Sequence, residues 1–332
     1  MIDVQALSKR YPTRLAVDDV TFSVKQGEIV GFLGPNGAGK TTTMRVLTGF
    51  LPPTSGSARV AGHDVVTQST AARAALGYLP ESAATYPEMR VSEYLAFRAR
   101  LEGVPDGRVR ERVGEAIERC LLGDVARRRI ENLSKGYRQR TALAGALVHQ
   151  PPVLILDEPT IGLDPVQIIR IRETIRQLGR DRAVLLSTHI LPEVEAVCDR
   201  VLIIDRGRIV AEGTPAELRG KLAGAPVVRV VARGRVDLRD ALAALPGVTA
   251  VEVEDAESET TARVVAAAET DLREAIFALA VARGWVLREL AREALSLEDV
   301  FVRLTRHEET PEAAVAAGPS DVPAPESGAS PS

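Results

Sequence analysis

The stretch Gly34-Pro35-Asn36-Gly37-Ala38-Gly39-Lys40-Thr41 decides the fold of this chain. It has the spacing G-x-x-x-x-G-K-[ST], and it stands between a short apolar run at 28–33 and a helical pattern that begins at Lys40. Glycines at these places let backbone N–H groups wrap around a dense anion such as a triphosphate. The N-terminus of the following helix adds partial positive charge. We therefore expect Lys40 to reach the β- and γ-phosphates and Thr41, with Thr42 beside it, to offer a hydroxyl to Mg²⁺.

Apolar runs further along the chain predict the sheet to which this loop belongs. The runs at 153–156, 183–186 and 201–204 are typical of buried parallel strands in an α/β sheet. Ligands of open α/β sheets bind at the carboxyl ends of such strands. Asp157 follows the first run, where a Walker B aspartate holds Mg²⁺ through water. Glu158 comes next and is expected to polarise a water molecule as general base.

Changes in pattern divide the chain into parts. Residues from about 82 to 150 have helical spacing, which predicts a helical subdomain inserted in an α/β core over 1–219. Strand and helix patterns over 225–305 follow the order β-α-β-β-α-β, typical of small α+β ferredoxin-like domains. A last helix is expected to begin at Ser296. Residues 307–332 are rich in Ala, Pro, Ser and Glu without periodicity, so we expect a disordered tail.

Composition and charge narrow the class of protein. The 332 residues are 45% hydrophobic and 26% charged, an ordinary soluble balance, and the net charge of −3 gives no basic footprint for nucleic acid. Cys120 and Cys198 belong to no CxxC pair, which argues against a zinc site or a disulfide framework. The N-terminus has no signal-peptide pattern, and no run approaches the ~20 apolar residues of a membrane span. A membrane role is therefore expected to need a partner.

Further motifs identify a family. Leu133-Ser134-Lys135-Gly136-Tyr137-Arg138-Gln139-Arg140 precedes the stretch LILDEPTIGLDP at 154–165, and His189 follows the next predicted strand. With the phosphate loop, this order of motifs resembles the ABC ATPase family over residues 1–218. The resemblance implies a P-loop NTPase (RecA-like) core that binds ATP and Mg²⁺ and hydrolyses ATP. It also implies a head-to-tail dimer, with each ATP between 34–42 of one chain and 134–136 of the other.

The resemblance assigns roles to single residues. Tyr11 matches the aromatic residue that stacks on adenine. Ser134 and Gly136 match signature residues that touch the γ-phosphate bound by the other chain, and Asp164 matches the D-loop aspartate at the dimer seam. His189 matches the catalytic residue that contacts the γ-phosphate and positions the attacking water. The residues predicted to contact the nucleotide are Tyr11, Gly34, Pro35, Asn36, Gly37, Ala38, Gly39, Lys40, Thr41, Thr42, Glu81, Ser134, Gly136 and Asp164, and those predicted to hold the metal are Thr41, Asp157 and Glu81.

The chain departs from the family pattern at four positions. Glu81 stands where most members have glutamine; it can still orient water or Mg²⁺, but it adds a negative charge beside the nucleotide. Lys135 and Tyr137 replace the glycine and glutamine of the commonest signature sequence, and Ile161 replaces a small residue. None of these changes removes an atom that hydrolysis plainly requires, so we expect them to affect the rate and not the reaction.

Residues 77–81, 86–89 and 297–301 are similar to one branch of the family, the ATP-binding proteins paired with ABC-2 type permeases, including gliding-motility and drug-resistance exporters. That similarity implies export through a separately encoded permease, which residues 82–91 would face, and a cytoplasmic location on the inner face of the membrane. Two alternatives stay open. One is a soluble ABC ATPase acting on ribosomes or DNA, disfavoured by the single cassette and the lack of heptads. The other is a regulatory module that holds ATP without hydrolysis, which Glu158 and His189 disfavour. The sequence does not indicate the cargo.

Overall fold

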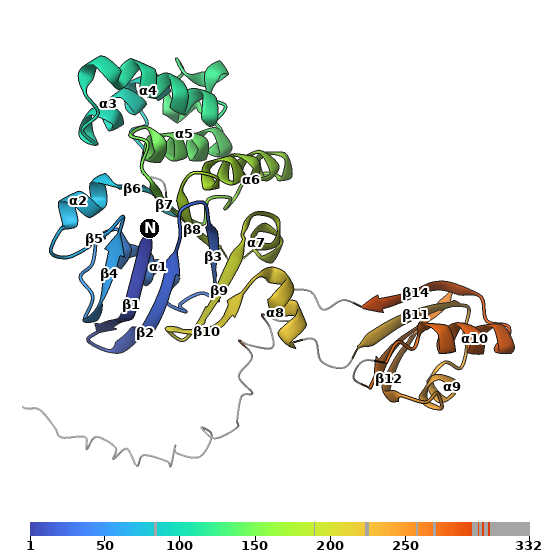
Figure 1. Cartoon of the computed structure of the whole chain (residues 1–332). Coiled ribbons are helices and arrows are strands. Elements are labelled where there is room, and N and C mark those ends of the chain that lie inside the picture. Colours follow the sequence, from blue (N-terminus) through green and yellow to red (C-terminus); the bar gives the residue numbers. More distant parts are fainter. Residues whose placement is uncertain are drawn as a thin grey trace, which may run out of the picture.

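The computed structural model describes residues 1–82, 85–188, 190–222, 226–256, 258–267 and 270–293, together with Glu298, Phe301 and Thr305. Three sheets organise these residues, one of six strands and two of four (Figure 1). None of the helices in this described part is long and apolar enough to cross a bilayer. His189 and residues 306–332, including the predicted tail, lie outside the described residues, as does the predicted helix start at Ser296.

The six-stranded sheet carries the phosphate loop. Its strand order is β10-β9-β3-β8-β7-β6, with every neighbouring pair parallel except β10 and β9. The strands are β3 (Ile29–Leu33), β6 (Leu76–Leu79), β7 (Val153–Asp157), β8 (Ala183–Thr188), β9 (Arg200–Asp205) and β10 (Arg208–Gly213). Strands β3, β7 and β8 are buried at every position, as expected of a parallel sheet covered on both faces. The apolar runs of the sequence therefore form the centre of this sheet.

An antiparallel sheet covers one side of this core and was not expected from the sequence. Its order is β2-β1-β4-β5, from β1 (Ile2–Tyr11), β2 (Arg14–Val24), β4 (Ser55–Val60) and β5 (His63–Asp64). Helix α1 (Lys40–Leu47) contributes Met44 and Leu47 to the shared core, while α2 (Ser69–Ala74) contributes Ala72. The rings of Phe22 and Phe32, one from each sheet, lie 5.6 Å apart between centroids. This packing fixes the phosphate loop between the two sheets.

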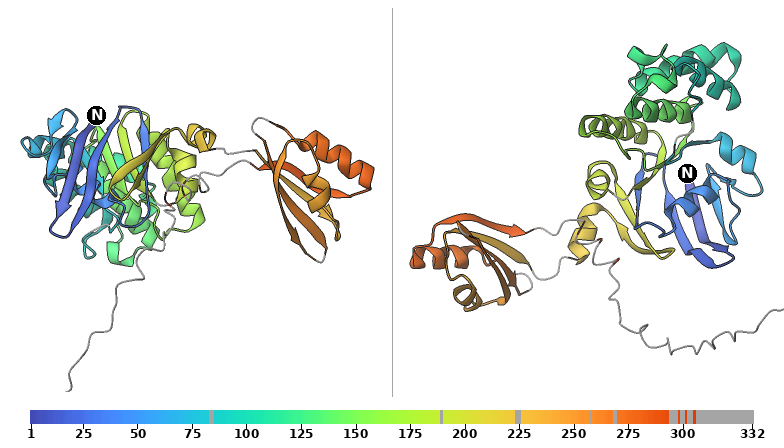
Figure 2. Two further views of the ribbon diagram at one scale, coloured as in Figure 1. Left: turned by 90° about the horizontal axis from the view of Figure 1, so that it is seen from below. Right: turned by 180° about the vertical axis from the view of Figure 1, so that it is seen from behind.

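Helices cover the other face of the six-stranded sheet and extend beyond it (Figure 1 and Figure 2). They are α3 (Val91–Leu101), α4 (Asp106–Arg119), α5 (Lys135–Leu147), α6 (Pro165–Gly179), α7 (Leu191–Val197) and α8 (Pro215–Leu222), with two 3₁₀ turns at Gly123–Val125 and Ile130–Asn132. Tyr94, Leu95 and Leu143 from the helices join Leu154 and Leu156 of the sheet in one apolar core. The first three helices fill the segment for which the sequence predicts a helical subdomain.

The C-terminal part contains an antiparallel sheet with its own core. Its elements are β11 (Val227–Arg233), α9 (Arg239–Ala243), β12 (Val248–Asp255), β13 (Glu259–Ala266), α10 (Arg273–Arg283) and β14 (Leu287–Glu293). The strand order is β12-β13-β11-β14, and each neighbouring pair is antiparallel. Val230, Leu242, Val264 and Ile276 lie in its core, so both helices pack against the sheet. The order of elements is the one that the sequence predicts.

Candidate active site

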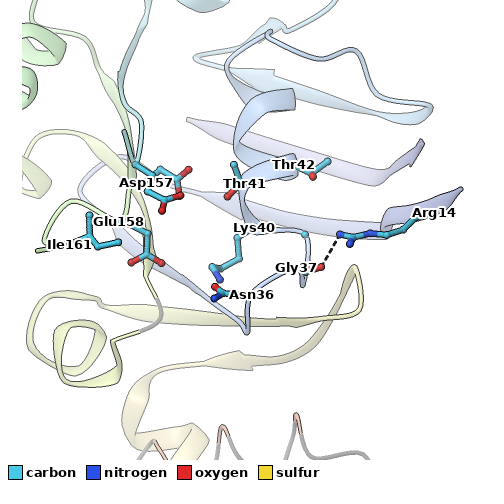
Figure 3. A pocket seen from close by; sticks show the side chains of 11 residues that line it. Arg14, Asn36, Gly37, Lys40, Thr41, Thr42, Asp157, Glu158 and Ile161 are labelled. Atoms are coloured by element: carbon cyan, nitrogen blue, oxygen red, sulfur yellow. Dashed lines mark hydrogen bonds between the residues drawn. The ribbon is translucent and has the colours of Figure 1, made fainter. Parts of the chain in front are cut away.

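A cavity of about 340 Å³ lies between the loop after β3 and the ends of β6 and β7 (Figure 3). Its lining residues are Arg14, Asn36, Gly37, Gly39, Lys40, Thr41, Thr42, Glu81, Asp157, Glu158 and Ile161. All except Arg14 and Ile161 belong to the residues that the sequence predicts at the nucleotide or the metal or, for Glu158, as the catalytic base. The fold thus brings the phosphate loop and the acidic pair to one place, although more than a hundred residues separate them in the chain.

The loop requires glycine where it approaches neighbouring backbone. A Cβ atom on Gly34 would lie 2.4 Å from the carbonyl oxygen of Ile204, and one on Gly39 would lie 2.6 Å from that of Ala16. Gly39 also has φ of +113°, a conformation that a side chain disfavours. Among the described residues no side chain caps α1, and its first turn holds no acid. The N–H groups of this helix start are therefore suited to an anion.

Lys40 places a positive charge in this cavity. Its side chain is buried, and its Nζ donates a hydrogen bond of 2.6 Å to the carbonyl oxygen of Gly34. Burial lowers the pKa of Lys40, while the negative charges of Glu158, Asp157 and Glu81 oppose that shift. A buried cation facing three carboxylates is a site that a magnesium nucleotide fits, because its phosphates and its cation have partners of opposite charge.

Asp157 lies at the end of β7, where its carboxylate meets a hydroxyl from the neighbouring strand. Ser187 donates a hydrogen bond to Oδ1 of Asp157, and the two residues are direct partners in the parallel register of β7 and β8. Burial raises the pKa of Asp157, and the bond from Ser187 acts in the opposite direction. Ser187 was missed as a site residue in the sequence. The sequence did contain a signal for it: Asp157 and Ser187 are each the first polar residue after an apolar run, and the two runs form adjacent strands.

Glu158 adopts a backbone conformation that is rare outside glycine. Its φ is +49°, and its N–H donates to the carbonyl oxygen of Ser187 at 3.0 Å. Such a left-handed conformation costs an L-residue about 1–2 kcal/mol. Strain of this kind is retained where the surrounding structure enforces it, which is commonly at a functional site. Here it turns the chain sharply after β7 while the carboxylate still faces the cavity (Figure 3).

Arg14 is a cavity residue that the sequence analysis did not identify. It begins β2, and its guanidinium donates a hydrogen bond of 3.0 Å to the carbonyl oxygen of Gly37, drawn as a dashed line in Figure 3. The sequence offers only the proximity of Arg14 to Tyr11 as a signal. Tyr11 itself ends β1 and is absent from the cavity lining in the described part of the chain. Its stacking on adenine remains a prediction.

Ser134, Gly136 and Asp164 lie outside the cavity lining as the structure describes it. Ser134 caps α5, where its hydroxyl accepts from the N–H of Tyr137 at 3.4 Å. Asp164 caps α6, where its Oδ1 accepts from the N–H of Gln167 at 2.9 Å. Both residues therefore stand at helix starts. Among the other loop residues, Gly34, Pro35 and Ala38 form the loop without lining the cavity.

The signature residue Tyr137 has a structural contact that glutamine could not make in the same way. Its hydroxyl donates to the carboxylate of Asp124 in the first 3₁₀ turn. The guanidinium of Arg140 lies 4.3 Å from the centre of its ring and also donates to the carbonyl oxygen of Leu121 at 2.9 Å. Tyr137, where the commonest signature has glutamine, therefore connects the start of α5 to the 3₁₀ turn at Gly123–Val125.

A buried carboxylate links the segment that follows β7 to the last residue of β8. Glu193, in the first turn of α7, is 1% exposed and accepts hydrogen bonds from the hydroxyls of Thr160 at 2.6 Å and Thr188 at 3.2 Å. Arg172 approaches its other oxygen at 3.8 Å. The sequence analysis missed Glu193, because an acid in a helical first turn is ordinary. Its position indicates that it holds the loop after Glu158 beside the end of β8.

Comparisons with known proteins agree with this arrangement. Residues 17–161 match the ABC transporter family model. The chain is 38% identical over 308 residues to Nod factor export ATP-binding protein I of Paraburkholderia xenovorans, which covers 92% of this chain and 97% of that protein. It is also 38% identical over 305 residues to a daunorubicin resistance ATP-binding protein of Streptomyces coeruleorubidus, covering 92% and 95%. Both alignments are too long to end before the C-terminal sheet, so these relatives share that part.

Solved structures give the same result for the fold. The structure of an ATP binding subunit of an ABC transporter is similar with a TM-score of 0.62 and 32% identity, covering 67% of this chain and 92% of that one. A dimeric cassette bound to ADP and Pi has the same fold, with a TM-score of 0.60 and 22% identity. The chain therefore belongs to the ABC transporter ATP-binding proteins, as an ABC ATPase of the branch that includes Nod factor export and drug resistance ATPases.

Proposed function

We propose that this ABC ATPase drives export through a separately encoded ABC-2 type permease, bound to it at the cytoplasmic face of the membrane. The observation that carries the proposal is the similarity over 92% of the chain to a Nod factor export protein, together with an intact cavity for ATP hydrolysis. A linearmycin resistance ATP-binding protein of Bacillus subtilis, 36% identical over 235 residues, adds a second kind of exporter. The cargo would be chosen by the permease.

The cavity residues suggest how a magnesium nucleotide would be held. Lys40 and the helix start at α1 suit the phosphates, while Thr41, Asp157 and Glu81 would hold Mg²⁺. When bound, Mg²⁺ neutralises charge on the phosphate oxygens. No three His, Cys, Asp or Glu side chains gather as a metal site in the described ranges. That fits an ion that usually takes one or two carboxylates and completes its shell with phosphates and water.

Glu158 would act as general base. Its carboxylate lines the cavity opposite the phosphate loop, so it is placed to accept a proton as a water oxygen attacks the γ-phosphorus. The bond from that phosphorus to the bridging oxygen then breaks, which leaves ADP and inorganic phosphate. We propose that His189 positions the same water. Lys40 would stabilise charge on the phosphates throughout.

A second copy of the chain would complete the site. Ser134, Gly136 and Asp164 stand at helix starts outside the cavity lining of their own chain, which suits residues that face a nucleotide held by another copy. Two chains in head-to-tail order would then enclose two ATP molecules, and hydrolysis would let them separate. Residues 82–91 would transmit this movement to the permease.

The remaining parts follow from the same proposal. The element order and the strand order β12-β13-β11-β14 favour a ferredoxin-like domain over 225–305, after a cassette over 1–219 whose helical subdomain spans about 82–150. Residues 307–332 would be a disordered and dispensable tail. A chain truncated after Arg306 is therefore expected to keep its ATPase activity; loss of activity would show that the tail has a role.

Capture of the partner tests the transport proposal. Tagged Glu158→Gln protein would be isolated from gently solubilised membranes with ATP and Mg²⁺, because slow hydrolysis should preserve the ATP-bound assembly. A stoichiometric membrane protein with several spans is the expected companion. Ribosomes, DNA or no membrane protein in its place would refute the export proposal. Lys40→Ala is the matched control, since it should lose ATP and, with it, any ATP-dependent assembly.

A further inference from the structure

Two loops of the same chain hold each other through a reciprocal contact outside the cavity. They are the signature loop, residues 134–136, and the D-loop, residues 162–164. A Cβ atom on Gly162 would lie 1.9 Å from Nζ of Lys135, and one on Gly136 would lie 1.8 Å from Oε1 of Gln167 in the first turn of α6. Lys135 of the signature loop thus lies against a glycine of the D-loop, and Gln167, just after the D-loop, lies against a glycine of the signature loop.

The backbone on both sides fixes this contact. Gly162 has φ of +69°, and Cε and Cδ of Lys135 also lie within 2.7 Å and 3.2 Å of where its Cβ would be. The cap of Asp164 on the N–H of Gln167 orients the helix turn that presents the Gln167 side chain. On the other side, the cap by Ser134 orients α5. Although Lys135 is an exposed residue, the end of its side chain lies against Gly162 of the D-loop.

This contact depends on the residues of this chain. In the commonest signature sequence a glycine stands at the position of Lys135, and it could not reach across to the D-loop. Gly136 is buried and leaves no room for a side chain of its own beside Gln167. The substitution at the signature therefore creates a connection within one chain between two segments that both belong to the proposed dimer seam.

We propose that Lys135 and Gln167 are positioning residues that couple the signature loop to the D-loop. The inference rests on the proposed function, in which Ser134 and Gly136 contact a nucleotide held by a second copy. When that nucleotide engages the signature loop, the reciprocal contact moves the D-loop and Asp164 with it. Neither Lys135 nor Gln167 lines the described cavity, so the binding of the chain's own nucleotide does not depend on them.

ATP-driven dimerisation tests this coupling, measured by light scattering in a Glu158→Gln background across a range of ATP concentrations. Gln167→Ala is expected to raise the ATP concentration for half-maximal dimerisation about fivefold or more, in the usual range of coupling between sites. Its melting temperature and the ATP affinity of the monomer are expected to stay unchanged. Gln177→Ala is the matched control: the same substitution of an exposed glutamine on the same helix, about 15 Å further along.

Two further variants separate coupling from a general structural role. Gln167→Glu keeps the length of the side chain and an oxygen at the Oε1 position beside Gly136, so it is expected to dimerise like the parent. Lys135→Ala combined with Gln167→Ala is expected to dimerise no worse than the more impaired single variant, because the two side chains join the same pair of loops and losing either contact already uncouples them. If the fold-changes of the two single variants multiplied in the double variant, the residues would act independently and the coupling would be overturned. So would a Gln167→Ala variant that behaves like Gln177→Ala. A Glu158→Gln parent that stays monomeric with ATP would instead refute the proposed dimer, and the coupling with it.

Discussion

Replacement of Glu193 by alanine should destabilise the cassette although Glu193 touches no predicted ligand. The carboxylate accepts from the hydroxyls of Thr160 and Thr188, which are 2% and 0% exposed. Leaving a buried polar group without its partner costs about 1–3 kcal/mol. Arg172 adds little, because its side chain is partly exposed and 3.8 Å away. Two such losses give about 2–6 kcal/mol. At roughly 2–4 °C per kcal/mol for a part of this size, the melting temperature should fall by about 4–24 °C.

The assay is thermal unfolding followed by fluorescence, with ATP turnover measured well below the transition. Glu193→Gln keeps an acceptor oxygen and should lose less than half as much stability. Glu195→Ala is the control, since Glu195 lies on the same helix but pairs with a partly exposed Arg219 at 2.8 Å. Turnover by Glu193→Ala should fall more than ATP affinity, because Thr160 follows Glu158 closely and Thr188 precedes His189. If Glu193→Ala has the same melting temperature as Glu195→Ala, the buried hydrogen bonds of Glu193 do not hold these loops.

Three further predictions concern titrating groups. Asp157→Asn should abolish hydrolysis yet raise the melting temperature at pH 8. Burial raises the pKa of Asp157, so the ionised carboxylate destabilises the folded chain above that pKa. If the gain in melting temperature did not shrink in acid, this reasoning would be contradicted. Burial raises the pKa of Cys120 to about 12 and also raises that of Cys198. Iodoacetamide at pH 8 should therefore label these thiols only in the unfolded chain. Rapid labelling of the native chain would show that the thiols are not buried. Burial alone would raise the pKa of Glu28, but its hydrogen bond from Arg200 at 2.8 Å lowers it. The resulting stabilisation is present above the pKa of the unfolded chain and is lost as the pH falls through the lowered pKa of the folded chain. Wild type should therefore have a higher melting temperature than Glu28→Gln at pH 7 and the same melting temperature in strong acid.

Local motifs made the phosphate loop and the acidic pair predictable. The glycine spacing, the strand before it and the helix after it lie within about twenty residues of sequence, so one pattern gives both the turn and its chemistry. Asp157 and Glu158 follow a fully apolar run that forms only a buried strand here. The order of strands and helices in the C-terminal part was predictable for the same reason, since each element carries its own periodicity.

Contacts between distant segments were not predictable in this way. The sheet of β1, β2, β4 and β5 pairs strands that alternate between buried and exposed positions, and nothing local shows which strand lies beside which. Arg14 reaches the phosphate loop only because β2 packs beside it, and Ser187 meets Asp157 only through the strand register. The spacing over 82–150 also gave no helix boundaries: the structure shows that α4 begins at Asp106, just after Pro105.

The most direct test of the account is phosphate release by Glu158→Gln beside its ATP affinity. Glu173→Gln, the same substitution at an exposed position of α6, is the matched control. If Glu158 is the general base, as proposed, its amide variant should bind ATP as tightly as wild type. It should release phosphate at least about 100-fold more slowly, in the range of general-base catalysis. The control should turn over normally. If Glu158→Gln hydrolysed ATP at the wild-type rate, Glu158 would not be the base, and the catalytic assignment of this cavity would fail.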